Sequence, residues 1–199
     1  KKKIIGVDIG MTHIAVTSDD KQYGAISDEL ARRVEKKAAC IARKQKLNVC
    51  LKRKGLPVVN LTDHKAEAFA RNEIGRALNK LIENLPNGSP VAIERLNVKD
   101  MRFKSRQMNR RLRASQLGYI QDKLKFKLDE RGKRYRSVQP AYSSQQCHRC
   151  GFVHEDNRRS QSEFKCLNCD HTENADVNAA RNIAKRFGDD ELNQLHFRE

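Results

Sequence analysis

The chain has 199 residues, enough for one buried core with a small inserted module but not for two large domains. It contains 41 Lys and Arg residues against 25 Asp and Glu, and the resulting formal net charge of +16 predicts a polyanionic partner. No run approaches the roughly 18 apolar residues of a membrane-spanning helix, so the sequence argues against an integral membrane protein.

The first part of the chain predicts a three-stranded antiparallel meander followed by two helices. The strands are expected at residues 3–9, 14–17 and 22–26. The helices are expected from Asp28 to about Cys50 and from about Asp63 to Leu85. The first of these helices is strongly basic, and the Gly and Pro residues at 55–57 separate it from the second.

The rest of the chain predicts two more strands and two more helices around a cysteine-rich segment. A short apolar strand, 91–93, should place Glu94 at its end, and a strand at 134–138 follows a helix with apolar residues at 117, 120, 124 and 128. The last helix is expected to open at Asp176. This order predicts an α/β fold, a mixed sheet with flanking helices. We expect a core at 1–141, an inserted ribbon at 142–174 and a returning core segment at 175–199.

Basic residues concentrate in two segments. Residues 32–54 hold ten Lys or Arg against one acid, and residues 95–136 hold fifteen against four. A single Lys or Arg is best explained as part of a solvated helix face. Like charges at helical spacing repel one another, however, so their density favours nucleic acid as the partner. The predicted phosphate contacts, which combine a loop with a helix start, are Arg102, Lys104, Arg106, Arg110 and Arg111.

Four of the six cysteines form two C-x-x-C pairs separated by 15 residues. The predicted ligands of a tetrahedral zinc site are Cys147, Cys150, Cys166 and Cys169. Four thiolates leave no open position for water, so this zinc is expected to be structural. Gly151 permits a tight turn after the first pair, whereas Asp170 stands where glycine is more usual in the second.

The remaining cysteines, Cys40 and Cys50, have no spaced partner. The apolar run after the opening lysines breaks at Asp8, far short of a secretory segment, so a reducing, intracellular compartment is expected. Thiols there are more often free or metal-bound than paired in disulfides. We expect both cysteines to pack as helix residues.

Three acidic residues predict a metal cluster. Asp8 interrupts an apolar strand, where a lone carboxylate would cost several kcal/mol unless a cation compensated it. Glu94 ends another buried strand, and if these strands are neighbours both side chains meet at one sheet edge. Asp176 could complete the group. Oxygen ligands suit Mg²⁺, and two ions about 3.5–4 Å apart can activate water and stabilise the leaving oxygen of a phosphodiester.

Each acid also has a purely structural explanation. Asp8 could turn the chain before Gly10, Asp176 could cap a helix, and Glu94 could pair with Arg95. Taken singly, each acid is explained as well by structure as by catalysis. The fold order, the basic charge and the cysteine pairs together favour the metal cluster.

Four segments resemble the TnpB family, transposon-encoded proteins related to the compact type V CRISPR effectors. The segments are 5–10 (IGVDIG), 93–96 (IERL), 144–151 (SQQCHRCG) and 176–183 (DVNAARNI). Their order and spacing match over nearly the whole chain. The combination is specific, although no single segment is.

The resemblance implies an RNase H-like RuvC fold, RNA-guided DNA cleavage, and catalytic roles for Asp8, Glu94 and Asp176. It also implies a structural zinc beside the substrate channel, and a prokaryotic cytoplasmic protein that joins the nucleoid when bound to DNA. Family members carry a further N-terminal portion that grips guide RNA, whereas this sequence starts within a few residues of its first strand. Guide RNA is therefore an expected partner of the full-length protein or complex.

The sequence thus favours a Mg²⁺-dependent DNA endonuclease, with Mn²⁺ as the alternative ion and in-line attack of water leaving a 5′-phosphate and a 3′-hydroxyl. Two alternatives belong to other classes. One is a catalytically silent nucleic-acid-binding module, such as a repressor on a nuclease scaffold. The other is a zinc-scaffold interaction protein. The presence of all three acids favours the enzyme, and the scaffold leaves Asp8 unexplained.

Overall fold

A five-stranded mixed sheet forms the centre of the fold in the order β3-β2-β1-β4-β5. The computed structural model describes residues 2–25, 28–61, 64–98, 101–102, 104–106, 109, 112, 115–160 and 162–194. The strands are β1 (Ile5–Asp8), β2 (His13–Thr17), β3 (Gln22–Ala25), β4 (Val91–Glu94) and β5 (Tyr135–Val138). The first three form the predicted antiparallel meander, while β4 and β5 run parallel to β1.

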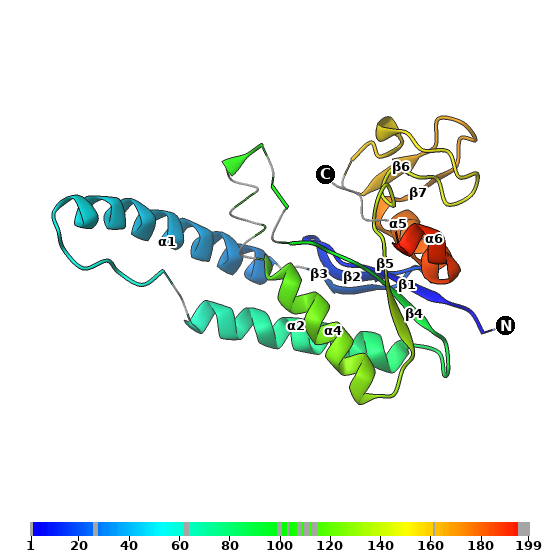
Figure 1. The fold of residues 1–199 in the computed structure, drawn as a ribbon, viewed down its shortest axis with the longest axis horizontal. Coiled ribbons are helices and arrows are strands. Elements are labelled where there is room, and N and C mark those ends of the chain that lie inside the picture. The colour runs from blue at the N-terminus through cyan, green and yellow to red at the C-terminus, as the bar shows by residue number, and fades with distance from the viewer. Residues whose placement is uncertain are drawn as a thin grey trace.

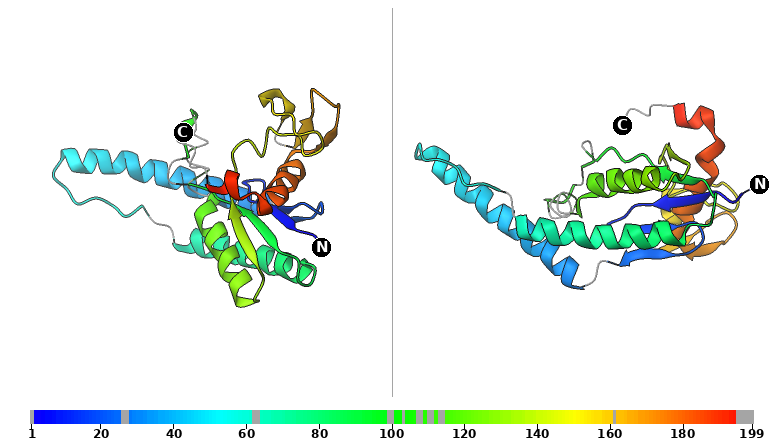
Figure 2. Two further views of the ribbon diagram at one scale, coloured as in Figure 1. Left: turned by 45° about the vertical axis from the view of Figure 1, so that its right-hand side comes forward. Right: turned by 90° about the horizontal axis from the view of Figure 1, so that it is seen from below.

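Helices cover both faces of this sheet (Figure 1). Successive strand residues point to opposite faces, so Val7 and Ile93 face one layer of helices while Gly6 and Ala92 face the other. On the first face, α2 and α4 lie side by side and close the main hydrophobic core (Figure 2). On the second face, α5 packs directly on β1. These helices are α2 (His64–Asn84), α4 (Leu117–Glu130) and α5 (Ala175–Lys185).

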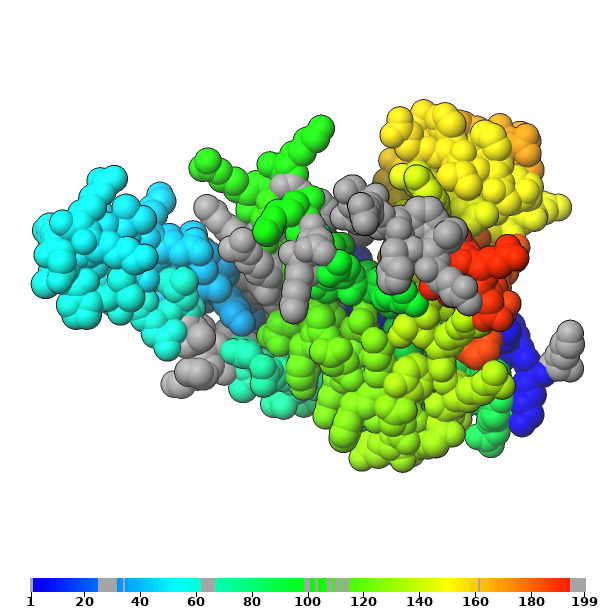
Figure 3. All heavy atoms as spheres, in the orientation of Figure 1, coloured from blue at the N-terminus to red at the C-terminus, as the bar shows by residue number. Residues whose placement is uncertain are grey.

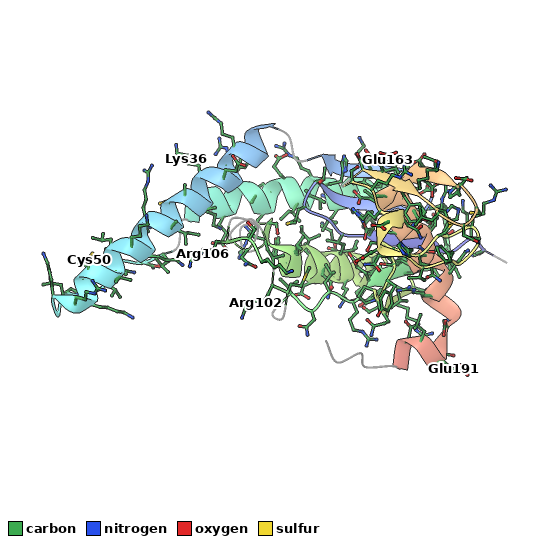
Figure 4. All side chains as sticks on the ribbon, turned by 90° about the horizontal axis from the view of Figure 1, so that it is seen from above. Lys36, Cys50, Arg102, Arg106, Glu163 and Glu191 are labelled. Carbon is green, nitrogen blue, oxygen red and sulfur yellow. The ribbon has the colours of Figure 1, made fainter. Side chains whose placement is uncertain are left out.

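Helix α1 (Asp28–Arg53) extends away from the sheet as an arm (Figure 1). The chain returns along it, and the Asn48 side chain exchanges two hydrogen bonds with the backbone of Val59, at 2.8 and 2.9 Å. Cys50 lies near the far end of this helix and is exposed (Figure 4), so the prediction that it packs is wrong. Cys40 is partly buried.

The cysteine-bearing segment, residues 142–160 and 162–174, forms a small unit that we call the ribbon. It contains the short helix η1 (Glu155–Asn157) and a two-stranded antiparallel sheet of β6 (Glu163–Lys165) and β7 (Thr172–Asn174). The chain ends its described part in η2 (Arg186–Gly188) and α6 (Asp190–Gln194). In the space-filling view the ribbon and the α1 arm project from opposite sides of the molecule (Figure 3).

The element order predicted from the sequence is confirmed in the described ranges, and so are the mixed sheet and its flanking helices. Helix α1 continues to Arg53, beyond its predicted end near Cys50. The division of the chain at residues 142 and 175 stays a prediction. Across the ranges given above, none of the helices combines the length and the apolar character that a membrane crossing demands.

The contact between β1 and α5 depends on Gly6. A Cβ atom built on Gly6 would lie 1.9 Å from the backbone oxygen of Ala180 and 2.6 Å from the backbone nitrogen of Ala184. Both neighbours belong to the helix backbone and cannot rotate away. Only glycine therefore allows α5 to lie this close to the central strand.

We expect Gly6→Ala to destabilise the fold by about 3 kcal/mol or more, because α5 must move off β1. Gly75→Ala is the matched control, since a Cβ there meets no atom within 4 Å. Gly75 lies within α2, so this substitution should instead stabilise the chain by about 0.5–1 kcal/mol. Thermal unfolding followed by circular dichroism measures both. Equal stability of the two variants would contradict this account of the β1–α5 contact.

Candidate active site and cysteine cluster

Asp8 and Glu94 lie side by side at the end of two neighbouring strands. β1 and β4 are parallel, with Val7 paired to Ile93, so the next residue of each strand falls at the same sheet edge and on the same face. Glu94 is buried and Asp8 is partly exposed. The backbone N–H of Ile9 donates a hydrogen bond of 2.8 Å to Glu94 Oε1, which holds the carboxyl against the end of β1.

The two carboxyl groups are electrostatically coupled. Burial, followed by the negative charge of Asp176, raises the pKa of Asp8 from 3.8 to about 7. Burial, followed by the charge of Asp8, raises the pKa of Glu94 well above its ordinary value. A hydrogen bond between the two side chains lowers the pKa of Asp8 and raises that of Glu94. Like charges in a desolvated site resist joint ionisation, and a bound cation would favour the charged form of both groups.

Asp176 approaches the same edge from α5. Its backbone N–H and that of Val177 donate to the Asn174 side-chain oxygen, at 3.0 and 3.2 Å. Asn174 is therefore the helix cap, and the structural alternative in which Asp176 caps the helix is wrong. The carboxylate of Asp176 instead pairs with the ribbon residue Arg158, whose Nη2 lies 2.9 Å from Asp176 Oδ1.

Arg158 is a site residue that the sequence analysis missed. Its positive charge lowers the pKa of Asp8, opposing the larger effects of burial and Asp176. The guanidinium thus acts on two of the three acids. Nothing in its local sequence separates it from the other 40 basic residues, and only the fold brings it to the sheet edge.

The spacing of the three acids limits how an ion could bind. Among the described residues, the groups of potential ligands whose donor atoms all lie within 4.8 Å of one another do not include Asp8, Glu94 and Asp176 together. A single small ion would therefore need a side-chain movement to touch all three. A pair of ions about 3.5–4 Å apart tolerates wider spacing, because the outer acids can bind different ions.

The four predicted zinc ligands do come together. The sulfur atoms of Cys147, Cys150, Cys166 and Cys169 all lie within 4.8 Å of one another. Cys147 Sγ lies 3.8 Å from Cys169 Sγ, and Cys150 Sγ lies 3.5 Å from Cys166 Sγ. A tetrahedral ion with Zn–S bonds of about 2.3 Å places its ligands about 3.8 Å apart. The cluster thus has the dimensions of a metal site.

Two similar turns build this cluster. Gly151 N–H donates to the Cys147 carbonyl at 2.9 Å, and Asp170 N–H donates to the Cys166 carbonyl at 3.1 Å. Gly151 has a φ of 81° and Asp170 a φ of 52°, so both occupy the left-handed region. The substitution of aspartate for glycine in the second turn is compatible with that conformation, which Asp tolerates better than most residues.

Buried amides hold the ribbon against α5. Asn178 Nδ2 donates to the Gln146 carbonyl at 2.8 Å, and Asn182 Nδ2 donates to the carbonyls of Ser143 and Gln146 at 2.9 and 2.6 Å. Within the ribbon, the fully buried Asn157 joins the two cysteine turns, because it donates to Phe152 and accepts from Leu167. This scaffold fixes Arg158, the next residue, relative to α5.

Of the predicted phosphate contacts, Arg102, Lys104 and Arg106 are exposed. Arg110 and Arg111 lie outside the described residues. Arg102 and Arg106 lie between the α1 arm and α4 (Figure 4). Their role in binding nucleic acid stays a prediction.

Comparisons with known proteins support the resemblance. Residues 118–183 match the model of the Cas12f1-like TNB domain family. The CRISPR-associated endodeoxyribonuclease Cas12f1 of Sulfoacidibacillus thermotolerans is 45% identical over 65 residues, covering 33% of this chain and 15% of that protein. InsQ of Escherichia coli (strain K12), named as a candidate RNA-guided DNA endonuclease, is 28% identical over 194 residues. This alignment covers 90% of the chain and 48% of InsQ, so the chain spans half or less of either relative.

Solved structures show the same similarity. A Cas12f1–sgRNA–target DNA complex matches with a TM-score of 0.60 and 28% identity, over 91% of this chain and 49% of that chain. A CRISPR–Cas12f ternary complex matches with a TM-score of 0.59 and 27% identity, over 92% and 39%. Both matches thus extend over most of the chain.

The raised pKa of Asp8 predicts how stability depends on pH. Between its ordinary pKa of 3.8 and its folded pKa of about 7, the folded chain binds more protons than the unfolded chain, so stability falls as pH rises through this window. In Asp8→Asn, the stability of the folded chain should decrease less over this pH range. Its melting temperature near neutral pH should therefore rise, by roughly 2–4 °C for each kcal/mol of stability gained. Added Mg²⁺ should raise the melting temperature of the unmodified chain and have less effect on the variant. A wild-type melting temperature that rises across this window relative to Asp8→Asn would contradict the assignment.

Proposed function

We propose that the chain forms the RuvC-like nuclease domain of an RNA-guided DNA endonuclease, on the basis of its similarity to Cas12f1 and InsQ. The single observation that carries the proposal is the coupled group of Asp8, Glu94 and Asp176 at one edge of the sheet. A fold has no structural need for three interacting carboxyl groups at this place. A divalent cation would stabilise all three as carboxylates.

The proposed reaction is hydrolysis of a DNA phosphodiester. Two Mg²⁺ ions, or Mn²⁺ in their place, would supply an activated water and stabilise the leaving oxygen, giving a 5′-phosphate and a 3′-hydroxyl. Asp8, Glu94 and Asp176 would hold the ions through their oxygens. Arg158 reaches this edge from the ribbon and is the side chain placed to neutralise a phosphate beside the acids.

Zinc is the proposed ion of the cysteine cluster. Four sulfur ligands at tetrahedral spacing, two of them fully buried, suit a structural Zn²⁺ with no open position. Its part in the reaction would be indirect, because it holds the ribbon that carries Arg158. The proposed domain division is a core at 1–141, the ribbon at 142–174 and a core segment at 175–199.

DNA and guide RNA are the proposed partners. The net charge of +16 and the exposed Arg102, Lys104 and Arg106 support contacts with phosphates, which neutralise such charge on binding. The Cas12f1 structure that this chain resembles is a complex with sgRNA and target DNA. For this chain, which covers about half of that protein, guidance by RNA would involve the whole nuclease.

We expect Asp8→Ala to abolish Mg²⁺-dependent cleavage of single-stranded DNA, with a loss of at least about 100-fold, because one ion loses its ligand. Asp122→Ala, which removes an exposed carboxylate from α4, is the control and should cleave at the wild-type rate. Gel analysis of end-labelled DNA with added Mg²⁺ measures both. Cleavage that survives Asp8→Ala would end the catalytic assignment. DNA binding with no cleavage by the unmodified chain would favour a silent binding module instead.

Arg158→Ala separates a role in the reaction from a role in folding. We expect cleavage to fall by roughly 10- to 1,000-fold, as for removal of other transition-state donors, when it is measured below the melting temperature of the variant. Arg159→Ala is the matched control on the next residue, which is exposed. Equal cleavage by the two variants would show that Arg158 does not assist the reaction.

Cys150→Ser should lower the zinc content by one equivalent per chain and lower the stability of the ribbon, because three thiolates bind zinc more weakly than four. Cys50→Ser, on the exposed part of α1, should retain all bound zinc. Elemental analysis after gel filtration measures both. Equal zinc content in the two variants would overturn the assignment of the cluster.

A further inference from the structure

A second group of potential metal ligands lies in the ribbon beside the cysteine cluster. His148 stands between the two cysteines of the first pair, His171 follows the second pair, and Glu173 lies in β7. One donor atom from each of these three residues lies within 4.8 Å of the other two. None of them serves as a ligand in the cysteine cluster, and the proposed nuclease reaction uses none of them.

The distances within this group suit a small tetrahedral ion. Glu173 Oε2 lies 3.1 Å from His148 Nδ1 and 3.7 Å from His171 Nε2. A Zn²⁺ ion bound at about 2.0–2.1 Å places its nitrogen and oxygen ligands about 3.3 Å apart. The observed distances fall on either side of that value. The two imidazole rings meet edge to face, with centroids 4.7 Å apart, so both can turn a nitrogen toward the same point.

Two of the donor atoms are buried without a hydrogen-bond partner. They are His171 Nε2 and Glu173 Oε2. A buried polar atom that loses its water and gains no partner costs about 1–3 kcal/mol. Here the two unpartnered atoms face each other, which makes a shared partner the simplest explanation. One cation between them would satisfy both.

Helix α5 supplies the surrounding support. Arg181 forms an ion pair with Glu173 through Oε1, whereas the distances to the two histidines are those of Oε2. The Asn178 side-chain oxygen accepts from the backbone N–H of His148 at 3.0 Å. This backbone hydrogen bond fixes the position of the His148 main chain relative to α5.

Two existing contacts of His148 must change when an ion binds. His148 Nδ1 lies 3.2 Å from Asn178 Oδ1, and Arg181 Nη1 lies 3.5 Å from His148 Nε2. With the ion on Nδ1, that nitrogen no longer donates to Asn178 Oδ1, and the ring proton moves to Nε2, so Arg181 also gives up its contact with the ring. Asn178 Oδ1 still accepts from the His148 backbone N–H, and Arg181 keeps its pair with Glu173. The contact given up by Arg181 is weak, because a hydrogen bond of 3.5 Å is at the limit of usable geometry.

We propose that His148, His171 and Glu173 bind a second Zn²⁺ ion. Two imidazoles and one carboxylate are a ligand set that zinc uses with its fourth position open to water. The charge balance favours a cation here, because four cysteine thiolates with one Zn²⁺ carry a net charge of −2. That charge argument rests on the zinc proposed above for the cysteine cluster. The argument from ligand geometry is independent of that zinc.

The second ion would tie three parts of the molecule together. His148 belongs to the first cysteine turn, Glu173 belongs to β7 beyond the second turn, and Arg181 links Glu173 to α5. Because α5 carries Asp176 and the ribbon carries Arg158, the ion would hold these two residues at a fixed separation. Zinc binding at this site would therefore stabilise the ribbon–helix contact on which the acidic edge depends.

The test is the zinc stoichiometry of the purified chain together with its Co²⁺ spectrum. The unmodified chain should bind two equivalents of zinc, and His171→Ala and Glu173→Gln should each bind one. His154→Ala, which removes an exposed ribbon histidine outside the group, is the control and should bind two. In Co²⁺-loaded protein, thiolate-to-cobalt charge transfer marks the cysteine cluster. That absorption should persist in all three variants while the second equivalent is lost from the first two.

One equivalent in the unmodified chain, with the thiolate absorption present, would overturn the second site and leave the cysteine site intact. Two equivalents retained in both His171→Ala and Glu173→Gln would also overturn it. If His171→Ala loses both ions through misfolding, the near-isosteric Glu173→Gln decides between these results. The measurement uses no DNA and no added Mg²⁺, so its outcome is independent of the proposed nuclease activity.

Discussion

The pairing of Asp8 with Glu94 at the ends of two parallel strands is the constraint on which the rest of the acidic edge depends. The strand register brings the two carboxyl groups together, and burial then raises the pKa of both. Without a cation, burial and mutual repulsion disfavour the charged form of both groups. The site therefore favours cation binding, because a cation offsets both the desolvation cost of the two carboxylates and the repulsion between them. The proposed metal chemistry follows from that preference.

Two further elements complete the edge, and both come from the C-terminal part of the chain. Helix α5 can deliver Asp176 only because Gly6 removes the side chain that would hold the helix away from β1. The ribbon delivers Arg158, and its position depends on amide contacts from Asn178 and Asn182. The acids therefore belong to the sheet and α5, whereas their positive partner belongs to the ribbon. A metal ion inside the ribbon would thus influence the proposed chemistry at the acidic edge outside it.

Much of the fold could be predicted from the sequence, because apolar periodicity and Gly–Pro breaks fix element type over short windows. The cysteine cluster could be predicted as well, since ligand spacing within each turn is local. Other features depend on contacts between distant segments. In the sequence, Arg158 cannot be distinguished from the other basic residues, which with it number 41, and only the packing of the ribbon on α5 places it at the site. Likewise, only the position of β7 brings Glu173 close to His148. Asn174 and Asp176 compete for the same capping role in sequence, and only the helix start at Ala175 decides between them. The sequence predicts a packed Cys50, whereas the residue is exposed. The residue pattern of the helix does not indicate that its far end extends away from the sheet.

Anomalous X-ray diffraction from crystals soaked in Mn²⁺ tests the central claim most directly. The account predicts Mn²⁺ peaks at the β1–β4 edge, within about 2.0–2.6 Å of oxygens from Asp8, Glu94 and Asp176, with the hydrogen bond between the first two acids broken. Crystals that hold Mn²⁺ elsewhere at saturating concentration, with no peak at this edge, would contradict it.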